Sequence, residues 1–264
     1  MSPQPSAIRI ALALLGAARG EPLTIPMLIG AGEVLQLSPN AMRVALSRLT
    51  SRGEVTARRR GAYALSSAQR LEVFAHVRRY RTGFAPRVAW KGDFLGALTA
   101  DLPRRNATLV RRRLRSLDLA GFRALSHGLW ARPNNLSGGR DAMAAHLARL
   151  GLDAGAELIG LTLDDRQRAT LERRYLISTD EQKAHALTHK VHALLPKLRR
   201  RPPREAATAS FWLGDEVLRF LARDPLLPQR LADPAPREKL ADAMSSLDEE
   251  GRRVWRSLLE ALDP

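Results

Sequence analysis

The stretch SPNAMRVALSRLTSRGEVTARRRGAYALS, residues 38–66, restricts the possible folds more than any other part of the sequence. Ser38 is a favoured helix N-cap, Pro39 suits the first helical turn, and Gly53 is a common helix stop. Four apolar side chains between them recur at i, i+3, i+4 and i+7, namely Met42, Ala45, Leu46 and Leu49. This spacing predicts an amphipathic helix that starts at Ser38 and ends at Gly53.

A hairpin is predicted directly after this helix, without a linker. EVTAR and AYALS each alternate apolar and polar side chains, and the RRG between them supplies the glycine that a tight turn needs. Upstream, the period of Ile8, Leu12 and Leu15 predicts one helix, and Thr24 is a good N-cap for a second. Three helices followed by an arginine-tipped hairpin predict a winged helix-turn-helix, which places its third helix in the major groove of DNA.

The third helix carries the side chains that such a role requires. Asn40, Arg43, Ser47 and Thr50 point away from the apolar side, and Arg48 lies at its flank. These residue types hydrogen-bond to base edges and phosphates. A basic exposed helix face can equally be a solvated surface, but the uninterrupted order of cap, helix, glycine stop and basic hairpin favours DNA binding.

Charge and composition agree with a polyanionic partner. The chain has 43 Lys and Arg against 27 Asp and Glu, a net charge of +16, and 45% hydrophobic residues, so it is basic and able to form a core. The excess lies before residue 202, because residues 202–264 carry more acidic than basic side chains. Cysteine is absent, which excludes disulfides, thiol catalysis and cysteine-based zinc sites. The apolar run 8–18 is too short to span a bilayer, so we expect a cytoplasmic protein without membrane contact.

Beyond about residue 84 the pattern changes to alternating strands and helices. FLGALTA, FRALS, LWARP and AELIGLTL are predicted strands, and residues 106–119 and 137–150 are predicted helices. The order βαββαβ predicts a ferredoxin-like domain, a unit that often dimerises through its sheet edge. From Asp164 onward the periodic segments are helical. We therefore expect an α+β multidomain protein with a winged-helix domain (1–84), a ferredoxin-like domain (85–164) and a C-terminal helical domain (165–264).

Four segments resemble, in order, the PaaX-type regulators, which repress phenylacetate catabolism. They are SPNAMRVALSRLTSRGEV, RRGAYALS, RRRLRSLDLAGFRALSHGLWARPNNL and FLARDPLLPQRL. The resemblance covers most of the chain, and its most specific part is the run from Gly128 to Leu136. It implies a homodimeric repressor that binds a pseudo-palindromic operator in double-stranded DNA, needs no cofactor, and is released by an aryl-CoA thioester such as phenylacetyl-CoA.

The resemblance also assigns residues to two sites. The DNA contacts that it implies are Ser38, Asn40, Arg43, Ser47 and Arg48 in the third helix and Arg58, Arg59 and Arg60 in the wing. For the effector it points to Arg111, Arg112, Arg115, Trp130, Arg132 and Asn134, whose cationic and aromatic side chains suit the phosphates and rings of a CoA ester. After DPLLP the chain continues ADPAPREKL, where the family tends to have a further Leu-Pro and a tryptophan, so the effector's identity stays open.

Two patterns raise the alternative of metal chemistry. His185, His189 and His192 share one helix face at a spacing compatible with a metal site, although an ordinary polar helix face explains them better, because no cysteine or well-placed carboxylate completes the site. Asp101 follows the first strand of the ferredoxin-like unit, where some nucleases of that fold use an aspartate to hold magnesium. A turn at the end of the strand explains Asp101 better, because one carboxylate is too little for a two-metal site. The alternative function is a metal-dependent nucleic-acid-processing enzyme; a third is a winged-helix protein without ligand control.

Overall fold

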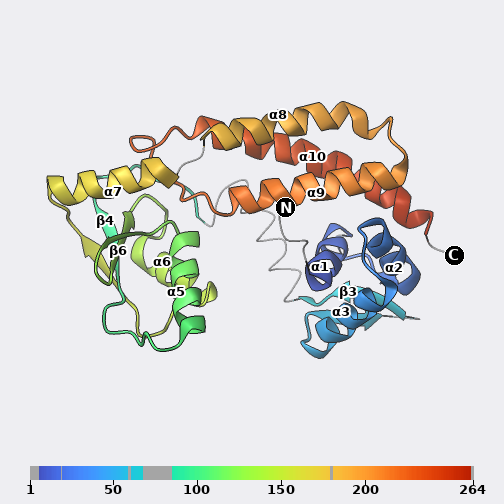
Figure 1. Ribbon diagram of the computed structural model, residues 1–264, viewed down its shortest axis with the longest axis horizontal. Coiled ribbons are helices and arrows are strands. Elements are labelled where there is room, and N and C mark those ends of the chain that lie inside the picture. The colour runs from blue at the N-terminus through green and yellow to red at the C-terminus, as the bar shows by residue number, and fades with distance from the viewer. Residues whose placement is uncertain (1–5, 19, 59–60, 68–84, 179–180, 263–264) are drawn as a thin grey trace. The chain divides into compact units, whose positions relative to one another are not determined.

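The computed structural model describes residues 6–18, 20–58, 61–67, 85–178 and 181–262 (Figure 1). Within these ranges the protein is α+β, with nine α-helices and two antiparallel sheets. The chain divides into two compact units according to its internal contacts. The first unit comprises Met1–Arg78, Thr188–Glu216 and Asp242–Pro264, and the second comprises Arg79–Leu187 and Val217–Ala241.

Up to residue 67, the described N-terminal part of the first unit contains three helices and a small sheet. Its elements are α1 (Ala7–Ala17), β1 (Leu23–Thr24), α2 (Ile25–Val34), α3 (Pro39–Ser51), β2 (Val55–Arg58) and β3 (Ala62–Leu65). The strands pair antiparallel in the order β1-β3-β2. Leu14, Leu28, Leu49 and Val55 are among the side chains buried in its core. The predicted helices and hairpin before residue 67 are confirmed.

The caps expected from the sequence define these helix ends. Thr24 Oγ1 accepts a hydrogen bond from the backbone N–H of Met27 at 3.3 Å, and Ser38 Oγ accepts one from that of Ala41 at 3.2 Å. Gly53 follows α3 with a φ of 68°, a left-handed conformation in which glycine avoids the strain of a Cβ atom. The chain therefore turns from α3 into β2 where the sequence predicts it.

Residues from three C-terminal helices complete the first unit. They belong to α8 (Glu181–Leu198), α9 (Pro203–Leu221) and α10 (Ala235–Glu260). Thr208 Oγ1, on α9, donates to the backbone carbonyl of Val34 at the end of α2 over 3.1 Å. Arg9 of α1 forms an ion pair with Asp215 of α9. The N-terminal helices and the C-terminal helices thus pack into one compact body.

The second unit is built on a four-stranded antiparallel sheet. Its elements are β4 (Phe94–Leu98), α5 (Ala107–Leu119), β5 (Arg123–Ser126), β6 (Leu129–Pro133), α6 (Gly139–Arg149), β7 (Glu157–Leu161) and α7 (Asp165–Ser178). The strand order is β5-β6-β4-β7. Leu117 of α5 and Met143 of α6 share one buried cluster with the sheet, whereas Leu171 and Tyr175 of α7 belong to another. The two strand–helix repeats predicted between residues 94 and 163 are present.

The structure does not test the helix predicted after the hairpin or the predicted domain boundaries. The helix predicted for residues 68–80 lies outside the described residues. The compact units group residues 188–216 and 242–264 with the N-terminal helices. The three-domain boundaries after residues 84 and 164 stay predictions. Among the described helices, none combines the length and the apolar character needed to cross a membrane.

Candidate nucleic-acid interface

Helix α3 has one buried side and one exposed side. Met42 and Leu49 are fully buried, and Ala45 and Leu46 nearly so. The Ser38 cap and Pro39 fix the start of the helix, and its apolar stripe sets its rotation against α1 and α2. Because the apolar stripe faces the core, the polar side chains between its members face solvent.

Every residue that the sequence assigns to DNA contact on this helix is exposed. These are Ser38, Asn40, Arg43, Ser47 and Arg48. Thr50 is exposed too, and Val44 lies between Arg43 and Ser47 with 41% of its surface accessible. The structure therefore gathers the predicted α3 residues on one solvent-facing surface, about two and a half helical turns long at roughly 3.6 residues per turn.

The hairpin β2–β3 adds a further basic side chain. Arg58 is the last residue of β2, is exposed, and pairs across the hairpin with Ala62. Gly61 has a φ of 76°, as a tight turn between antiparallel strands requires. Arg59 and Arg60, the other two predicted wing contacts, lie outside the described residues.

The charges of this surface have no close carboxylate among the described residues. Considering only described residues, no carboxylate lies within 4 Å of the guanidinium groups of Arg43, Arg48 or Arg58, whereas Arg52 is 3.8 Å from Glu54. An exposed guanidinium without an internal anion is available to phosphate or to the acceptor edge of guanine. We call the exposed side of α3 together with Arg58 the head surface.

The residues predicted to bind an effector do not come together in one site. Arg111, Arg112 and Arg115 are exposed on α5, while Trp130 is half-buried against the core beneath α5 and α6. Asn134 donates from Nδ2 to Asp93 Oδ2 over 2.7 Å.

Arg132 is buried rather than open to a ligand, being only 1% exposed. Its guanidinium donates to the backbone carbonyls of Ala120, Pro133 and Pro225 and to Asn135 Oδ1. Burial lowers the pKa of Arg132 to about 10. The arrangement indicates a structural role, in which the side chain joins β6 to the segment around Pro225.

A cavity that the sequence did not indicate lies within the second unit. It has a volume of about 220 Å³, below the 300–1,000 Å³ typical of small-molecule sites. Its lining includes Arg87, Lys183, Phe220, Arg223, Asp224 and Arg237. Arg237 lies 3.7 Å from Asp224, and Lys183 lies 5.9 Å from the Phe220 ring centre. These residues come from distant parts of the chain, so no local pattern could have revealed them.

The candidates for metal chemistry lie on the surface. His185, His189 and His192 are exposed on α8, and Asp101 is exposed in the turn after β4. In the part of the chain that the structure describes, no three His, Asp or Glu side chains are grouped so that they could hold a metal ion.

The described geometry defines an α+β protein with a basic, solvent-facing helix and hairpin. In comparisons, the fold matches that of an uncharacterized protein, Rv0674, from Mycobacterium tuberculosis. The match has a TM-score of 0.57 and 18% sequence identity, and covers 98% of this chain and 99% of the other. No protein-family model and no curated protein matches the chain. At this identity the likeness concerns the fold alone.

Proposed function

We propose that this chain is a ligand-responsive transcriptional repressor of the PaaX type, which binds DNA through the head surface. The observation that carries the proposal is the exposed side of α3, where Asn40, Arg43, Ser47 and Arg48 face solvent and the arginines have no described carboxylate within 4 Å. The order α1-β1-α2-α3-β2-β3, with the sheet order β1-β3-β2, supports a winged helix-turn-helix.

The second unit supports the rest of the proposed architecture. Its strand order β5-β6-β4-β7, with α5 and α6 against the same buried cluster, supports a ferredoxin-like domain. The edge strands β5 and β7 offer a surface for a homodimer. Such a dimer would read a pseudo-palindromic operator whose half-sites lie about 34 Å, or a multiple of that, apart.

An aryl-CoA or related thioester is the proposed effector, by way of the sequence resemblance. The exposed arginines of α5 and the cavity near Arg237 are two places in the second unit where its anionic parts could bind. The effector must bind one arrangement of the dimer more tightly than another, since only that difference in affinity can release DNA. The proposed setting is the cytoplasm, where the operator is.

Band-shift binding to the DNA upstream of the gene, at two salt concentrations and with or without phenylacetyl-CoA, tests the proposal. We expect tight binding that survives random competitor DNA and is reversed by the thioester. If binding is specific but unaffected by the thioester, the proposal of a repressor stands and phenylacetyl-CoA is not its effector. Binding that is only non-specific and salt-sensitive would contradict a repressor of this promoter.

A further inference from the structure

A second set of exposed arginines lies far along the chain from the head surface. Arg104 and Arg105 precede α5, and Arg111, Arg112 and Arg115 lie on it; all five are exposed. We call these five residues the α5 arginine face. Among described residues, no carboxylate lies within 4 Å of any of their guanidinium groups.

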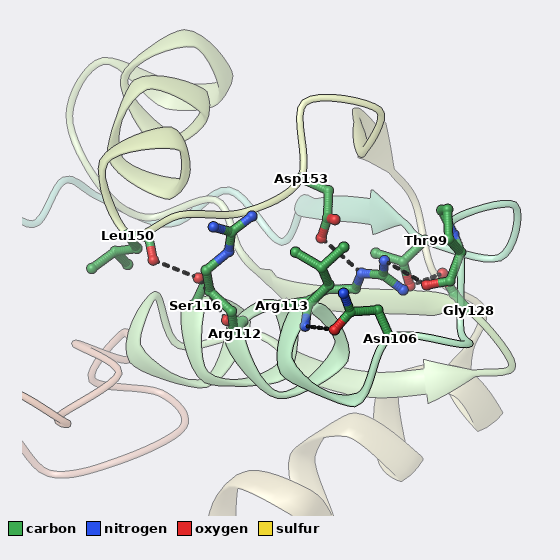
Figure 2. A network of polar contacts seen from close by, with 10 residues as sticks. Thr99, Asn106, Arg112, Arg113, Ser116, Gly128, Leu150 and Asp153 are labelled. Carbon is green, nitrogen blue, oxygen red and sulfur yellow. Dashed lines mark hydrogen bonds and ion pairs between the residues drawn. The ribbon is translucent and has the colours of Figure 1, made fainter.

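The other side of α5 is fixed to its unit by a polar network (Figure 2). Arg113 donates from Nε to Asp153 Oδ2 over 2.9 Å and from Nη2 to the carbonyl of Pro103 over 3.1 Å. Ser116 Oγ donates to the carbonyl of Leu150 over 2.8 Å. Asn106 Oδ1 accepts from the backbone N–H groups of Thr108 and Leu109. Arg111, Arg112 and Arg115 therefore lie on a helix whose position and first turn are fixed by these hydrogen bonds.

Neighbouring arginines of α5 differ in burial and in pairing. Within the run 111–113, Arg113 is buried and paired with Asp153, whereas Arg111 and Arg112 are exposed and have no described carboxylate within 4 Å. Packing and stability account for Arg113. They do not account for five exposed guanidinium groups, which repel one another and so favour an anion at this surface.

The shape and spacing of the face indicate an extended polyanion. Arg111 and Arg115 are one helical turn apart, about 6 Å along the axis. Double-stranded DNA presents one negative charge per about 1.7 Å of its axis, so several phosphates can meet such a face at once. A CoA thioester, by contrast, is more commonly held in a concave site. The cavity near Arg237 is lined by none of these five arginines.

We propose that the α5 arginine face binds the phosphate backbone of double-stranded DNA, as a second contact surface besides the head surface. The inference rests on the proposed DNA-binding function and adds a partner for the second unit. Contacts to phosphates carry no sequence information, so this surface strengthens binding to any duplex and leaves the choice of operator to the head surface.

The test compares two triple variants of the full-length chain. In one, Arg111, Arg112 and Arg115 become Gln. In the matched control, Arg166, Arg173 and Arg174 of α7 become Gln; these are also exposed, and α7 packs against the other buried cluster of the same unit. Both variants lose the same charge, so a general electrostatic effect would weaken both equally. Circular dichroism and thermal unfolding verify that each variant is folded.

Affinity for the operator and for a random duplex of equal length is measured from 50 to 200 mM salt. We expect the α5 variant to bind both duplexes on the order of tenfold more weakly at low salt, with a log–log salt slope about 2 to 3 units shallower. The α7 control should differ little from wild type. Equal slopes for the two variants would overturn the inference.

Other outcomes separate the inference from the proposed function. If the wild type binds its operator and the α5 variant binds it equally well, the proposal for the α5 arginine face is wrong and the proposed function stands. If the α5 variant keeps its DNA affinity but no longer responds to phenylacetyl-CoA, the arginines serve the phosphates of the thioester instead. A wild type that binds neither duplex overturns both proposals.

Discussion

Arg113 and Asp153 form an ion pair of 2.9 Å on the buried side of α5, while Arg112, its neighbour in sequence, faces solvent. One helix thus uses the same residue type for two purposes. The buried arginine ties α5 to the segment before β7, and the exposed ones have no described carboxylate within 4 Å. The hydrogen bond from Arg113 also lowers the pKa of Asp153.

Asp153→Asn should destabilise the second unit. The change removes the negative charge that pairs with a buried guanidinium and leaves at most a weaker, neutral acceptor, which is expected to cost about 1.5 to 3 kcal/mol of unfolding free energy at pH 7. Urea denaturation measures it. The control is Asp118→Asn, which removes a more exposed carboxylate 3.0 Å from Arg123 and should cost less than about 1 kcal/mol. Equal losses in the two variants would contradict the structural role of Arg113.

The same pair predicts a pH dependence. The folded-state pKa of Asp153 lies below the ordinary value of about 3.9, so the unfolded chain takes up this proton first. The pair's contribution is therefore complete above about pH 5 and is lost as the pH falls through the lower, folded pKa. The stability gap between wild type and Asp153→Asn should be constant from pH 5 to 8 and shrink below pH 4. A gap that widens on acidification would contradict this sign.

Arg43→Ala tests the head surface. If Arg43 reads a base, specific affinity should fall by roughly 1 to 3 kcal/mol while affinity for random DNA changes less. A loss of equal size on both would make Arg43 a phosphate contact. Arg52→Ala is the control, because Arg52 is exposed just after α3 but lies beside Glu54. Fluorescence anisotropy at fixed salt measures the affinity of the wild type and of each variant for both duplexes. If Arg43→Ala binds both as tightly as the wild type, Arg43 is not part of the interface.

Gly128→Ala should disrupt the hairpin between β5 and β6. Gly128 has a φ of 72°, and an added Cβ would lie 2.6 Å from Ala100 Cα. The left-handed conformation alone is expected to cost about 1 to 3 kcal/mol, and the backbone contact adds to it. Gly160→Ala is the control, since nothing lies within 4 Å of a Cβ on that β7 residue. Thermal unfolding of the two variants should differ by several degrees, and similar melting temperatures would contradict the close approach.

Arg132→Met distinguishes a structural residue from an effector contact. The variant leaves the carbonyls of Ala120 and Pro225 without their donor, so a loss of about 1 to 3 kcal/mol of stability is expected for each buried acceptor left unpaired. Denaturant unfolding measures this loss. A variant as stable as wild type that responds less to phenylacetyl-CoA would instead support the effector contact that the sequence resemblance implies.

Local signals made much of the fold predictable. Ser38, Gly53 and the stripe from Met42 to Leu49 define α3 within the chain itself, so both ends and the buried side of the helix follow from neighbouring residues. The predicted strand LWARP coincides with β6, again because the signal lies in neighbouring residues. The exposed side of α3 is one continuous segment, so the same local pattern that predicts the helix also predicts which of its residues face solvent.

Contacts between distant segments could not be predicted in this way. The Tyr175 hydroxyl lies 2.8 Å from the carbonyl oxygen of Gly121 and 3.1 Å from that of Ala131, so its one hydrogen has two possible acceptors. Nothing near residue 175 in the sequence indicates those partners. Arg132 shows the same limit, because a charged side chain in a strand is expected at the surface unless its buried acceptors are known. Its partner Pro225 lies 93 residues further along the chain.

The packing of the first unit makes its N-terminal helices dependent on residues more than 180 positions further along the chain. A Cβ at Gly30 of α2 would lie 2.8 Å from Leu262, and Phe211 of α9 packs edge to face with Trp255 of α10. A nonsense mutation after codon 241 would leave the codons of α3 intact, yet the protein would lack part of the core that supports them. If the proposed repressor function holds, truncations after residue 241 should therefore have the same phenotype as operator-binding mutants in a genetic screen for loss of repression.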